Sequence, residues 1–358
     1  MQPPTDTAER PMVLIWEVTQ ACELACEHCR ADAMPGRHPD ELSTAEGKAL
    51  LDDVRSFGED QLVVLSGGDP MQRPDLVDLV EYGTDIGLTM TLTPSGTSAL
   101  TRDRIEALAS AGLRRVAVSL DGATPAAHDD FRGESGSFEE TIRAARAATQ
   151  AGLPLQINTT VCSRTVDDLP SIADVVAQLG AVLWSVFFLV PVGRGRVLNP
   201  ISPQRAERVL SWLHDVRTDV PFGIKTTEAP HYRRVGLEEC EHSADQPPGV
   251  ERRGGIIAGD GFAFVSHTGE IYPSGFLPEA AGNVRTDDIV DVYRHADLFE
   301  ALRDRGRLSG KCGVCAYRHV CGGSRSRAYA ATGDPLASDP LCAYVPDDWD
   351  AGVETVGD

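Results

Sequence analysis

Lysine is nearly absent from the chain, because among 358 residues only Lys48, Lys225 and Lys311 occur. Lys plus Arg total 33 against 54 Asp plus Glu, which gives a formal net charge of −21. Such an acidic surface repels polyanions, so we expect no nucleic-acid partner. Acidic surfaces that are poor in lysine suit high salt, where ions screen self-repulsion. We therefore favour a halophilic source over an ordinary acidic protein from a GC-rich genome.

Long hydrophobic runs are missing as well. No apolar segment reaches the roughly 18–20 residues needed to span a bilayer, so we expect no membrane association. Residues 1–10 are polar and lack the apolar centre of a signal peptide, which favours a cytoplasmic protein. Hydrophobic residues still make up 42% of the chain, enough for a sizeable core in one large domain or two modest ones.

Cysteine, by contrast, is concentrated at two places. In a reducing compartment, nine cysteines do not predict a disulfide framework. The first group has the spacing C-x₃-C-x₂-C, and the second lies near the C-terminus. The two groups consist of Cys22, Cys26 and Cys29, and of Cys312, Cys315, Cys321 and Cys342. Both spacings are typical of metal or iron–sulfur ligands.

Apolar runs alternate with amphipathic segments from residue 13 to about 220. The apolar runs predict strands at Val13–Val18, Leu62–Leu65, Leu88–Thr93, Arg115–Leu120, Leu155–Val161 and Val182–Val190. The amphipathic segments predict helices at about Ser43–Phe57, Pro74–Ile86, Arg102–Ala111, Ser137–Ala151, Asp167–Leu179 and Pro203–Thr218. Capping boxes, Ser43 with Glu46 and Ser137 with Glu140, mark two of the helix starts. Six strand–helix units predict an α/β fold with a parallel sheet but are too few for a closed eight-stranded barrel, so we expect a partial (β/α)6 TIM-like barrel.

The pattern changes after the sixth unit. We predict a barrel core at 12–235, a linker at 236–255, a small α+β domain at 256–346 and an acidic tail at 347–358. Within the linker, Asp245–Gly255 is rich in Pro, Gly and charge. In the small domain, Phe262–Val265 and Glu270–Tyr272 predict a hairpin, and Asp287–Leu302 predicts a helix.

The first cysteine group follows the first predicted strand. Three thiolates hold three irons of a 4Fe-4S cube and leave the fourth iron open to a substrate or cofactor. Zinc is the alternative, but it needs His28 or a distant group as a fourth ligand. A second motif follows the second strand and consists of Gly67, Gly68, Asp69 and Pro70. Its glycines let the backbone approach a small ligand at the strand end where barrel sites gather, and Asp69 offers an acceptor for an ammonium group.

Together, the cysteine spacing and the Gly67–Pro70 turn resemble the radical S-adenosylmethionine (SAM) superfamily. The resemblance implies that the first cysteine group holds a 4Fe-4S cluster whose open iron chelates the amino and carboxylate groups of SAM. It implies that the turn, with Asp69 in place of the usual Glu, receives the SAM amino group. It also implies the chemistry, in which one electron from the cluster cleaves SAM to methionine and a 5′-deoxyadenosyl radical that abstracts hydrogen from the substrate.

Other positions match the superfamily in the same way. Ser119, at the end of the fourth strand, resembles a serine near the SAM carboxylate or ribose. Asn158 and Thr160, on the fifth strand, resemble positions that line the SAM pocket. His28 stands where an aromatic residue is usual. Arg194 lies in a loop that resembles the one near the adenine, and we expect it to be a surface charge.

The second cysteine group resembles the auxiliary-cluster (SPASM/twitch) extension of the superfamily. Four cysteines can close a cluster completely, with structural zinc as the alternative. Two cysteines of the full SPASM pattern are absent, because Ser274 occupies one place and Ser324 and Arg325 occupy the other. In the family both absent cysteines bind a further auxiliary cluster, so the resemblance implies two 4Fe-4S clusters here and not three.

Stretches outside the cysteines resemble the branch that modifies tetrapyrroles in heme biosynthesis. They are Thr226–Arg234, Cys321–Ala330 and Gly333–Cys342. The resemblance implies an iron porphyrin as substrate, decarboxylation or acetate removal as the reaction, and a ferredoxin or flavodoxin as reductant. The candidates for clamping propionates, with surface charges as the alternative, are Arg233, Arg234, Arg325 and Arg327. His231 is a candidate heme-iron ligand, and His267, Tyr272 and Phe276 are either core residues or part of a substrate pocket.

Other functions stay open on the sequence alone. SPASM enzymes also crosslink or decarboxylate ribosomal peptides, but commonly with an N-terminal recognition domain, for which we expect no room before residue 12. A non-catalytic iron–sulfur redox carrier or sensor would need no SAM pocket, yet the Gly67–Pro70 turn is present. A zinc-binding module is the simplest alternative. We favour the tetrapyrrole enzyme.

Overall fold

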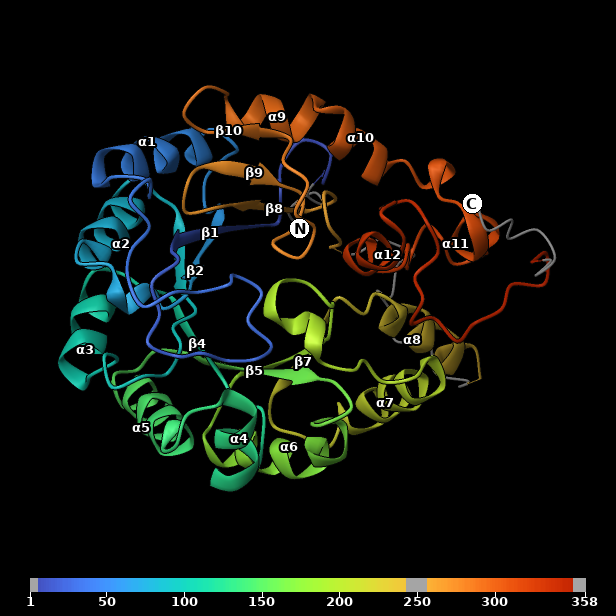
Figure 1. Ribbon diagram of the computed structural model, residues 1–358, viewed down its shortest axis with the longest axis horizontal. Coiled ribbons are helices and arrows are strands. Elements are labelled where there is room, and N and C mark those ends of the chain that lie inside the picture. The colour runs from blue at the N-terminus through green and yellow to red at the C-terminus, as the bar shows by residue number, and fades with distance from the viewer. Residues whose placement is uncertain (1–5, 243–255, 350–358) are drawn as a thin grey trace.

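The strands form one sheet that is not closed. The computed structural model describes residues 6–242 and 256–349, so the predicted Asp245–Gly255 segment lies outside them. Within these ranges the strand order is β10-β9-β8-β1-β2-β3-β4-β5-β6-β7 (Figure 1). The strands are β1 Val13–Thr19, β2 Leu62–Gly67, β3 Thr89–Leu92, β4 Arg115–Ser119, β5 Leu155–Val161, β6 Leu183–Phe188, β7 Gly223–Thr227, β8 Phe262–Val265, β9 Glu270–Tyr272 and β10 Gly282–Asn283. The predicted partial barrel followed by a small α+β domain is confirmed.

Helices cover the outside of this curved sheet (Figure 1). Those that follow the barrel strands are α1 Thr44–Arg55, α2 Leu76–Asp85, α3 Arg102–Ser110, α4 Pro125–Arg132, α5 Ser137–Gln150, α6 Leu169–Gln178, α7 Pro203–Val216 and α8 His231–His242. Those of the C-terminal part are α9 Ile289–His295, α10 Asp297–Arg303, α11 Gly310–Val314 and α12 Arg325–Thr332. The loops at the carboxyl ends of the strands are thereby left facing the centre of the ring.

Apolar residues on the face that packs against the helices bury the central strands. Leu14 and Trp16 of β1 and Leu65 of β2 are fully buried. Trp16 packs beneath α1, where a Cβ on Gly47 would lie 2.5 Å from Cη2 of Trp16. Gly47 therefore lets α1 approach the sheet closely.

The two predicted capping boxes have different outcomes. Ser43 caps α1 as expected, with its hydroxyl and the Glu46 carboxylate each accepting the other residue's backbone N–H. The prediction of a capping box at Ser137 is wrong. α5 already begins at Ser137, and its N-cap is Gly136 in a left-handed conformation. The Ser137 hydroxyl instead lies 3.3 Å from Nε2 of His128.

Among the described helices and strands, the sequence analysis did not predict α4, β7, α8, β10, α11 or α12. α4 begins with Thr124 as its cap and proline in its first turn, which is a recognisable helix start. β7 is a short edge strand whose residues are mostly half-exposed, so it lacks an apolar run. The helix predicted over Asp287–Leu302 is divided into α9 and α10 at Ala296, whose backbone is extended.

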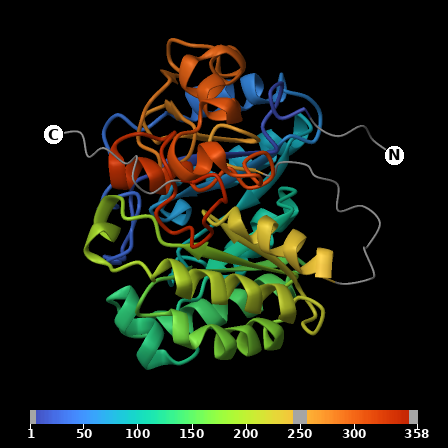
Figure 2. The same ribbon diagram turned by 90° about the vertical axis from the view of Figure 1, so that its right-hand side faces the viewer.

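The C-terminal part continues the sheet of the barrel. β8 pairs in parallel with β1, from Val13 opposite Phe262 to Trp16 opposite Val265. Figure 2 shows this orange segment lying against the blue N-terminal strands. The predicted end of the core at residue 235 falls inside α8.

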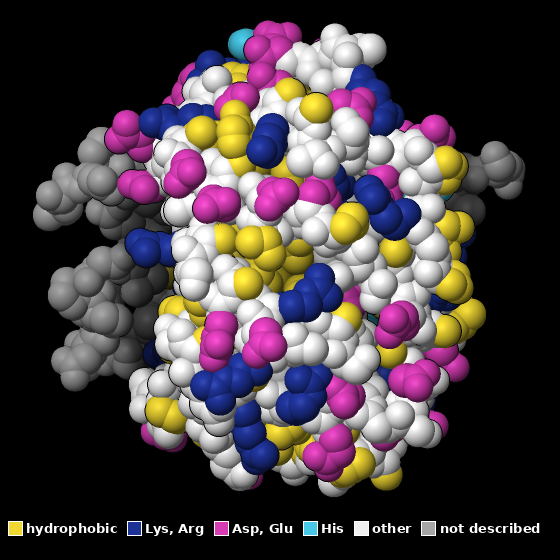
Figure 3. Space-filling view, turned by 90° about the vertical axis from the view of Figure 1, so that its left-hand side faces the viewer, with side chains coloured by type: hydrophobic (Ala, Val, Ile, Leu, Met, Phe, Trp, Pro, Cys, Tyr) yellow, Lys and Arg dark blue, Asp and Glu magenta, His cyan; other side chains and the backbone are white. Residues whose placement is uncertain are grey.

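Charges of both signs are interspersed over the face shown in Figure 3. Arginines and carboxylates alternate there, although acidic residues outnumber basic ones in the whole chain. No helix in the described ranges combines the length and the apolar character needed to cross a membrane.

Candidate functional site

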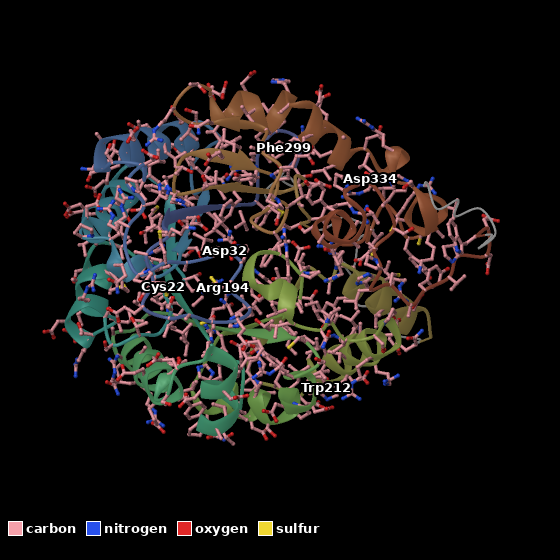
Figure 4. All side chains as sticks on the ribbon, in the orientation of Figure 1. Cys22, Asp32, Arg194, Trp212, Phe299 and Asp334 are labelled. Carbon is pink, nitrogen blue, oxygen red and sulfur yellow. The ribbon has the colours of Figure 1, made fainter. Side chains whose placement is uncertain are left out.

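The N-terminal cysteines lie in the loop that follows β1, across the carboxyl ends of the parallel strands. All three line one open cavity of about 930 Å³, a volume that includes the part open to solvent. Its other walls come from the ends of the strands and the loops after them, and include Gly67, Gly68, Ser119, Thr160 and Phe188. Cys22 and Arg194, which both line the cavity, lie near the centre of the ring in Figure 4.

The turn after β2 packs directly against the cysteine loop. The Gly68 N–H donates to the Thr19 carbonyl at 2.9 Å, and the Asp69 N–H donates to the Ala21 carbonyl at 2.7 Å. A Cβ on Gly68 would lie 2.5 Å from the carbonyl oxygens of Gln20 and Ala21, closer than side chains pack. Glycine at this position is therefore required by the cysteine loop itself.

The Asp69 carboxylate does not face the cavity. It is fully buried, where Oδ2 accepts from the Thr97 hydroxyl at 2.8 Å and Oδ1 accepts from two backbone N–H groups. The Asp69 carboxylate thus has its partners within the protein, and its contact with an ammonium group stays a prediction. Pro70 is also buried and begins a short 3-10 turn, so only Gly67 and Gly68 of the predicted motif reach the cavity.

Hydrogen-bond donors surround the cysteine sulfurs. The Leu24 N–H donates to Cys22 Sγ at 3.4 Å, and the Ser95 hydroxyl lies 3.6 Å from the same sulfur. Arg132 Nη1 donates to Cys26 Sγ at 3.8 Å. Burial raises the pKa of the Cys22 thiol, so a metal bound there has to displace its proton. Three thiols with these donors fit the ligand shell of an iron–sulfur cluster.

Arg132, at the end of α4, was not predicted as a site residue. Its guanidinium lies 2.7 Å from Oδ2 of Asp121, and both side chains are buried. His28 stacks on Phe131 with ring centroids 4.5 Å apart, and its Nε2 lies 4.0 Å from the same Asp121 oxygen. Burial and then the Arg132 charge lower the pKa of His28 to about 3, so its ring is neutral near pH 7.

Two further arginines line the cavity. Arg194 donates from Nε to the Cys26 carbonyl at 2.9 Å and from Nη1 to the Ala33 carbonyl at 2.8 Å. It braces the cysteine loop, so the expectation of a surface charge is wrong. Arg30 is held by the buried Glu17 at 2.6 Å. The two Arg194 contacts join residues 168 and 161 positions apart in the chain, so no local pattern could have revealed them.

The predicted pocket residues on β4 and β5 divide into two groups. Ser119 and Thr160 lie on the cavity wall. Asn158 is buried behind that wall, where its Oδ1 accepts from Gln156 Nε2 at 2.7 Å. Direct contact between Asn158 and a ligand of this cavity is therefore not expected.

Of the three candidates in the hairpin, only Phe276 reaches the cavity. His267 instead bonds to Glu17, with 2.7 Å between Nδ1 and Oε1. Tyr272 packs beside Phe264, with ring centroids 6.2 Å apart. The packing alternative therefore holds for His267 and Tyr272.

The C-terminal cysteines line a second pocket, of about 410 Å³. They are Cys312, Cys315, Cys321 and Cys342. Across residues 6–242 and 256–349, no three His, Cys, Asp or Glu side chains converge closely enough to hold a single metal ion. Donors reach two sulfurs, from Arg325 to Cys312 at 3.5 Å and from the Gly323 N–H to Cys321 at 3.4 Å.

His231 belongs to this second pocket. Its Nε2 lies 3.1 Å from Oδ2 of Asp339, and its side chain is 2% exposed. Burial favours the neutral ring, but the Asp339 carboxylate outweighs it and raises the pKa of His231 to about 9. His231 lines the second pocket beside Asp339 and does not line the first cavity, and its role as a heme-iron ligand stays a prediction.

The four arginines expected to clamp propionates are already bonded within the protein. Arg234 pairs with two glutamates. Nη1 of Arg327 donates to both carboxylate oxygens of Asp339, at 3.0–3.1 Å. Arg233 and Arg325 donate to backbone carbonyl oxygens. None of the four guanidinium groups lines the first cavity, and their role in clamping propionates stays a prediction.

The serines that replace two cysteines of the full SPASM pattern contact one carboxylate. Ser274 Oγ donates to Glu228 Oε1 at 3.3 Å, and Ser324 Oγ donates to Oε2 of the same residue. Ser326 adds a third hydroxyl at 2.9 Å. Glu228 follows β7 with φ 55°, a left-handed conformation that is uncommon outside glycine. A hydrogen-bonded carboxylate thus fills the position between the hairpin and α12.

Comparison with known proteins agrees with this geometry. A model of the Radical SAM superfamily matches residues 16–176. The AdoMet-dependent heme synthase of Methanosarcina barkeri is 41% identical over 342 residues, which cover 94% of this chain and 97% of that protein. The AdoMet-dependent heme synthase of Nitratidesulfovibrio vulgaris is 39% identical over 341 residues, which cover 93% and 92% of the two chains.

A solved structure shows the same fold. Streptococcus suis SuiB bound to S-adenosylmethionine superposes with a TM-score of 0.75 at 17% identity, over 94% of this chain and 78% of that one. At this identity the likeness concerns the fold alone.

Replacing Gly68 with alanine should displace the cysteine loop, because the new Cβ would overlap two carbonyl oxygens of that loop. We expect the iron content to fall by about one four-iron cluster per chain, and SAM cleavage to fall ~100-fold or more. Gly36→Ala is the matched control, because nothing lies within 4 Å of its Cβ position. Full iron content in Gly68→Ala, measured by anaerobic iron and sulfide assays, would contradict this assignment.

Proposed function

The chain belongs to the radical SAM superfamily and is an enzyme, and from this premise we propose that it modifies a side chain of an iron porphyrin in heme biosynthesis. The reaction proposed is decarboxylation or acetate removal. The main support for this substrate class is the sequence similarity to heme synthases along nearly the whole chain. The lining of the first cavity supports it, because aromatic and aliphatic side chains, among them Phe188, Leu189 and Phe276, border the space beside the cysteines.

Membership implies S-adenosylmethionine and a 4Fe-4S cluster as cofactors. We assign the cluster to Cys22, Cys26 and Cys29, which share one cavity wall and lack a fourth cysteine there. When bound, the cluster supplies the electron that cleaves SAM, and the radical so released abstracts hydrogen from the substrate. The protein binds both molecules in one cavity and excludes water from it.

Residues on the cavity wall are assigned to SAM. The backbone of Gly67 and Gly68 borders the cavity beside the cysteine loop, where it can hydrogen-bond an amino group. Ser119 offers a hydroxyl, and His28 offers a neutral aromatic face. Asn158 supports the adjacent strand from behind, and Asp69 fixes the Thr97 segment.

We assign a second 4Fe-4S cluster to the C-terminal pocket. The support for a cluster is the set of four thiols that line one pocket, which is enough to ligate every iron of a 4Fe-4S cube. The Arg325 guanidinium that donates to Cys312 balances part of the charge of the thiolates, and the Gly323 N–H donates to Cys321. A ferredoxin or flavodoxin is the proposed source of electrons.

Anaerobically reconstituted protein should contain about eight irons per chain, in two cubane clusters. Cys26→Ala should abolish SAM cleavage and leave about four irons, because only the first site is lost. Cys162→Ala is the matched control, since Cys162 is buried among Phe131, Leu189 and Leu198 and lines neither site. A wild-type content of four irons would disprove the second cluster.

Ser324→Cys should not add a cluster, because the second absent cysteine position is still Ser274 and the Glu228 carboxylate fills the site. Iron per chain and the electron paramagnetic resonance spectrum of the reduced protein should match the wild type. Loss of the hydroxyl contact to Glu228 should cost about 1 kcal/mol in unfolding free energy. An increase of one whole cluster would show that the position is open to iron.

Iron coproporphyrin should accelerate SAM cleavage over the slow rate with SAM alone, because substrate binding orders the cavity and excludes water. The test is anaerobic incubation with reductant, with 5′-deoxyadenosine and the porphyrin mass followed together. A porphyrin mass change matched to 5′-deoxyadenosine supports the proposal. If porphyrins neither bind nor accelerate cleavage while a small peptide encoded nearby does, the enzyme is a peptide maturase.

A further inference from the structure

The barrel strands depart from the acidic composition of the rest of the chain. Strands β2 to β7 contain one arginine, one lysine and no aspartate or glutamate. The two cations are Arg115 on β4 and Lys225 on β7. On β1, the carboxylate of Glu17 is already bonded to Arg30 and His267. The inside of the barrel is therefore positive, in a chain whose net charge is −21.

Both cations face the inside of the curved sheet. Neighbouring residues of a strand point to opposite faces, and paired residues share a face. Val116 packs in the core with the helices, so Arg115 beside it points inward. Trp184 belongs to the same core and pairs with Ile224, so Lys225 points inward as well. The two side chains thus come from either side of β5 and β6.

Lys225 lies next to the wall of the first cavity. Phe187 lines that cavity and pairs with Thr227, which is two residues beyond Lys225 on the same face of β7. One strand spacing of about 4.8 Å and two residues of about 3.3 Å each separate the backbones of Lys225 and Phe187. The Lys225 side chain is exposed, and its four-carbon stem lets the ammonium group reach toward a molecule in the cavity.

The protein neutralises neither charge. Within the part of the chain that the structure describes, Lys225 and Arg115 have no hydrogen-bond or ion-pair partner. Lys311, by contrast, donates to the Cys342 carbonyl at 3.0 Å. Desolvation by the surrounding protein, and then the Arg115 charge, lower the pKa of Lys225. A side chain that is both accessible and desolvated lies in a recess, and an anion bound in that recess would relieve the repulsion between the two cations.

We propose that Lys225 and Arg115 form an anion site on the inner face of the barrel, which binds a side-chain carboxylate of the porphyrin. The proposal rests on the proposed function, which supplies a large ring with propionates in the adjacent cavity. The site lies on β4 and β7, away from the loop after β1 that carries the cysteines. A carboxylate held there fixes which edge of the ring turns toward the cysteines.

The first test measures the affinity of oxidised, cluster-loaded protein for iron coproporphyrin and for its methyl ester, without reductant so that no turnover occurs. Lys225→Gln should weaken coproporphyrin about 10-fold and leave the ester within about 2-fold, because only the acid carries carboxylates. Lys225→Arg should restore most of the lost affinity, since it keeps the charge. Lys48→Gln removes the same charge from α1, where Nζ lies over the Tyr82 ring, and should change neither affinity.

Arg115→Gln tests the second cation, with the exposed Arg102→Gln on α3 as its matched control. We expect coproporphyrin to weaken about 3- to 10-fold and the ester to stay within about 2-fold. Iron content and SAM affinity show whether each variant is intact, and Arg115→Gln decides if Lys225→Gln is not. Equal losses for the acid and the ester, or no loss for either, would overturn the proposal.

Acetylation with acetic anhydride separates the anion site from the proposed substrate. Because the chain has only three lysines, mass spectrometry can follow each amine. Citrate at constant ionic strength should slow acetylation of Lys225 about 3-fold or more and leave Lys48 unchanged. If coproporphyrin does not bind wild-type protein, the proposed substrate fails, while protection of Lys225 by citrate upholds the anion site. Absence of protection by both citrate and coproporphyrin would overturn the site.

Discussion

Two backbone hydrogen bonds between the turn after β2 and the loop after β1 position the first cysteine site. They join Gly68 to Thr19 and Asp69 to Ala21, and the absence of a side chain on Gly68 permits the contact. The buried Asp69 carboxylate then holds the Thr97 segment against the same turn. A loop that would otherwise be free is thereby fixed to the most buried part of the sheet, and its three thiols share one cavity with the strand ends.

Charge is distributed unevenly between the surface and the two cysteine sites. The chain carries a formal charge of −21, yet each cysteine site contacts a buried arginine, Arg132 at the first and Arg325 at the second. Clusters bound by thiolates are anionic, so nearby cations stabilise them and raise their reduction potentials. The acidic surface cannot supply such positive charge, so the buried arginines beside the cysteines supply it.

The sequence was sufficient for the features that depend on local pattern. Buried parallel strands are continuous apolar runs, and metal ligands occur at short fixed spacings, so the barrel and both cysteine groups were predicted. Arg132 and Arg194 were not, because their contacts with Cys26 join segments far apart in the chain. Motif matching also placed the Asp69 carboxylate in the ligand site, whereas its hydrogen bonds turn it inward. A motif identifies which segment borders a site, and packing decides which atoms of it face the ligand.

The pairing of β8 with β1 has a consequence for electron movement. Because the C-terminal part is hydrogen-bonded into the barrel sheet, it does not hang from a hinge. Arg327 adds a second link, from the end of β6 at Leu189 to Asp339 beside the C-terminal cysteines. The separation of the two cysteine sites is therefore set when the protein folds. Electron tunnelling between them would run over a constant distance, and its rate would respond to driving force and not to domain motion.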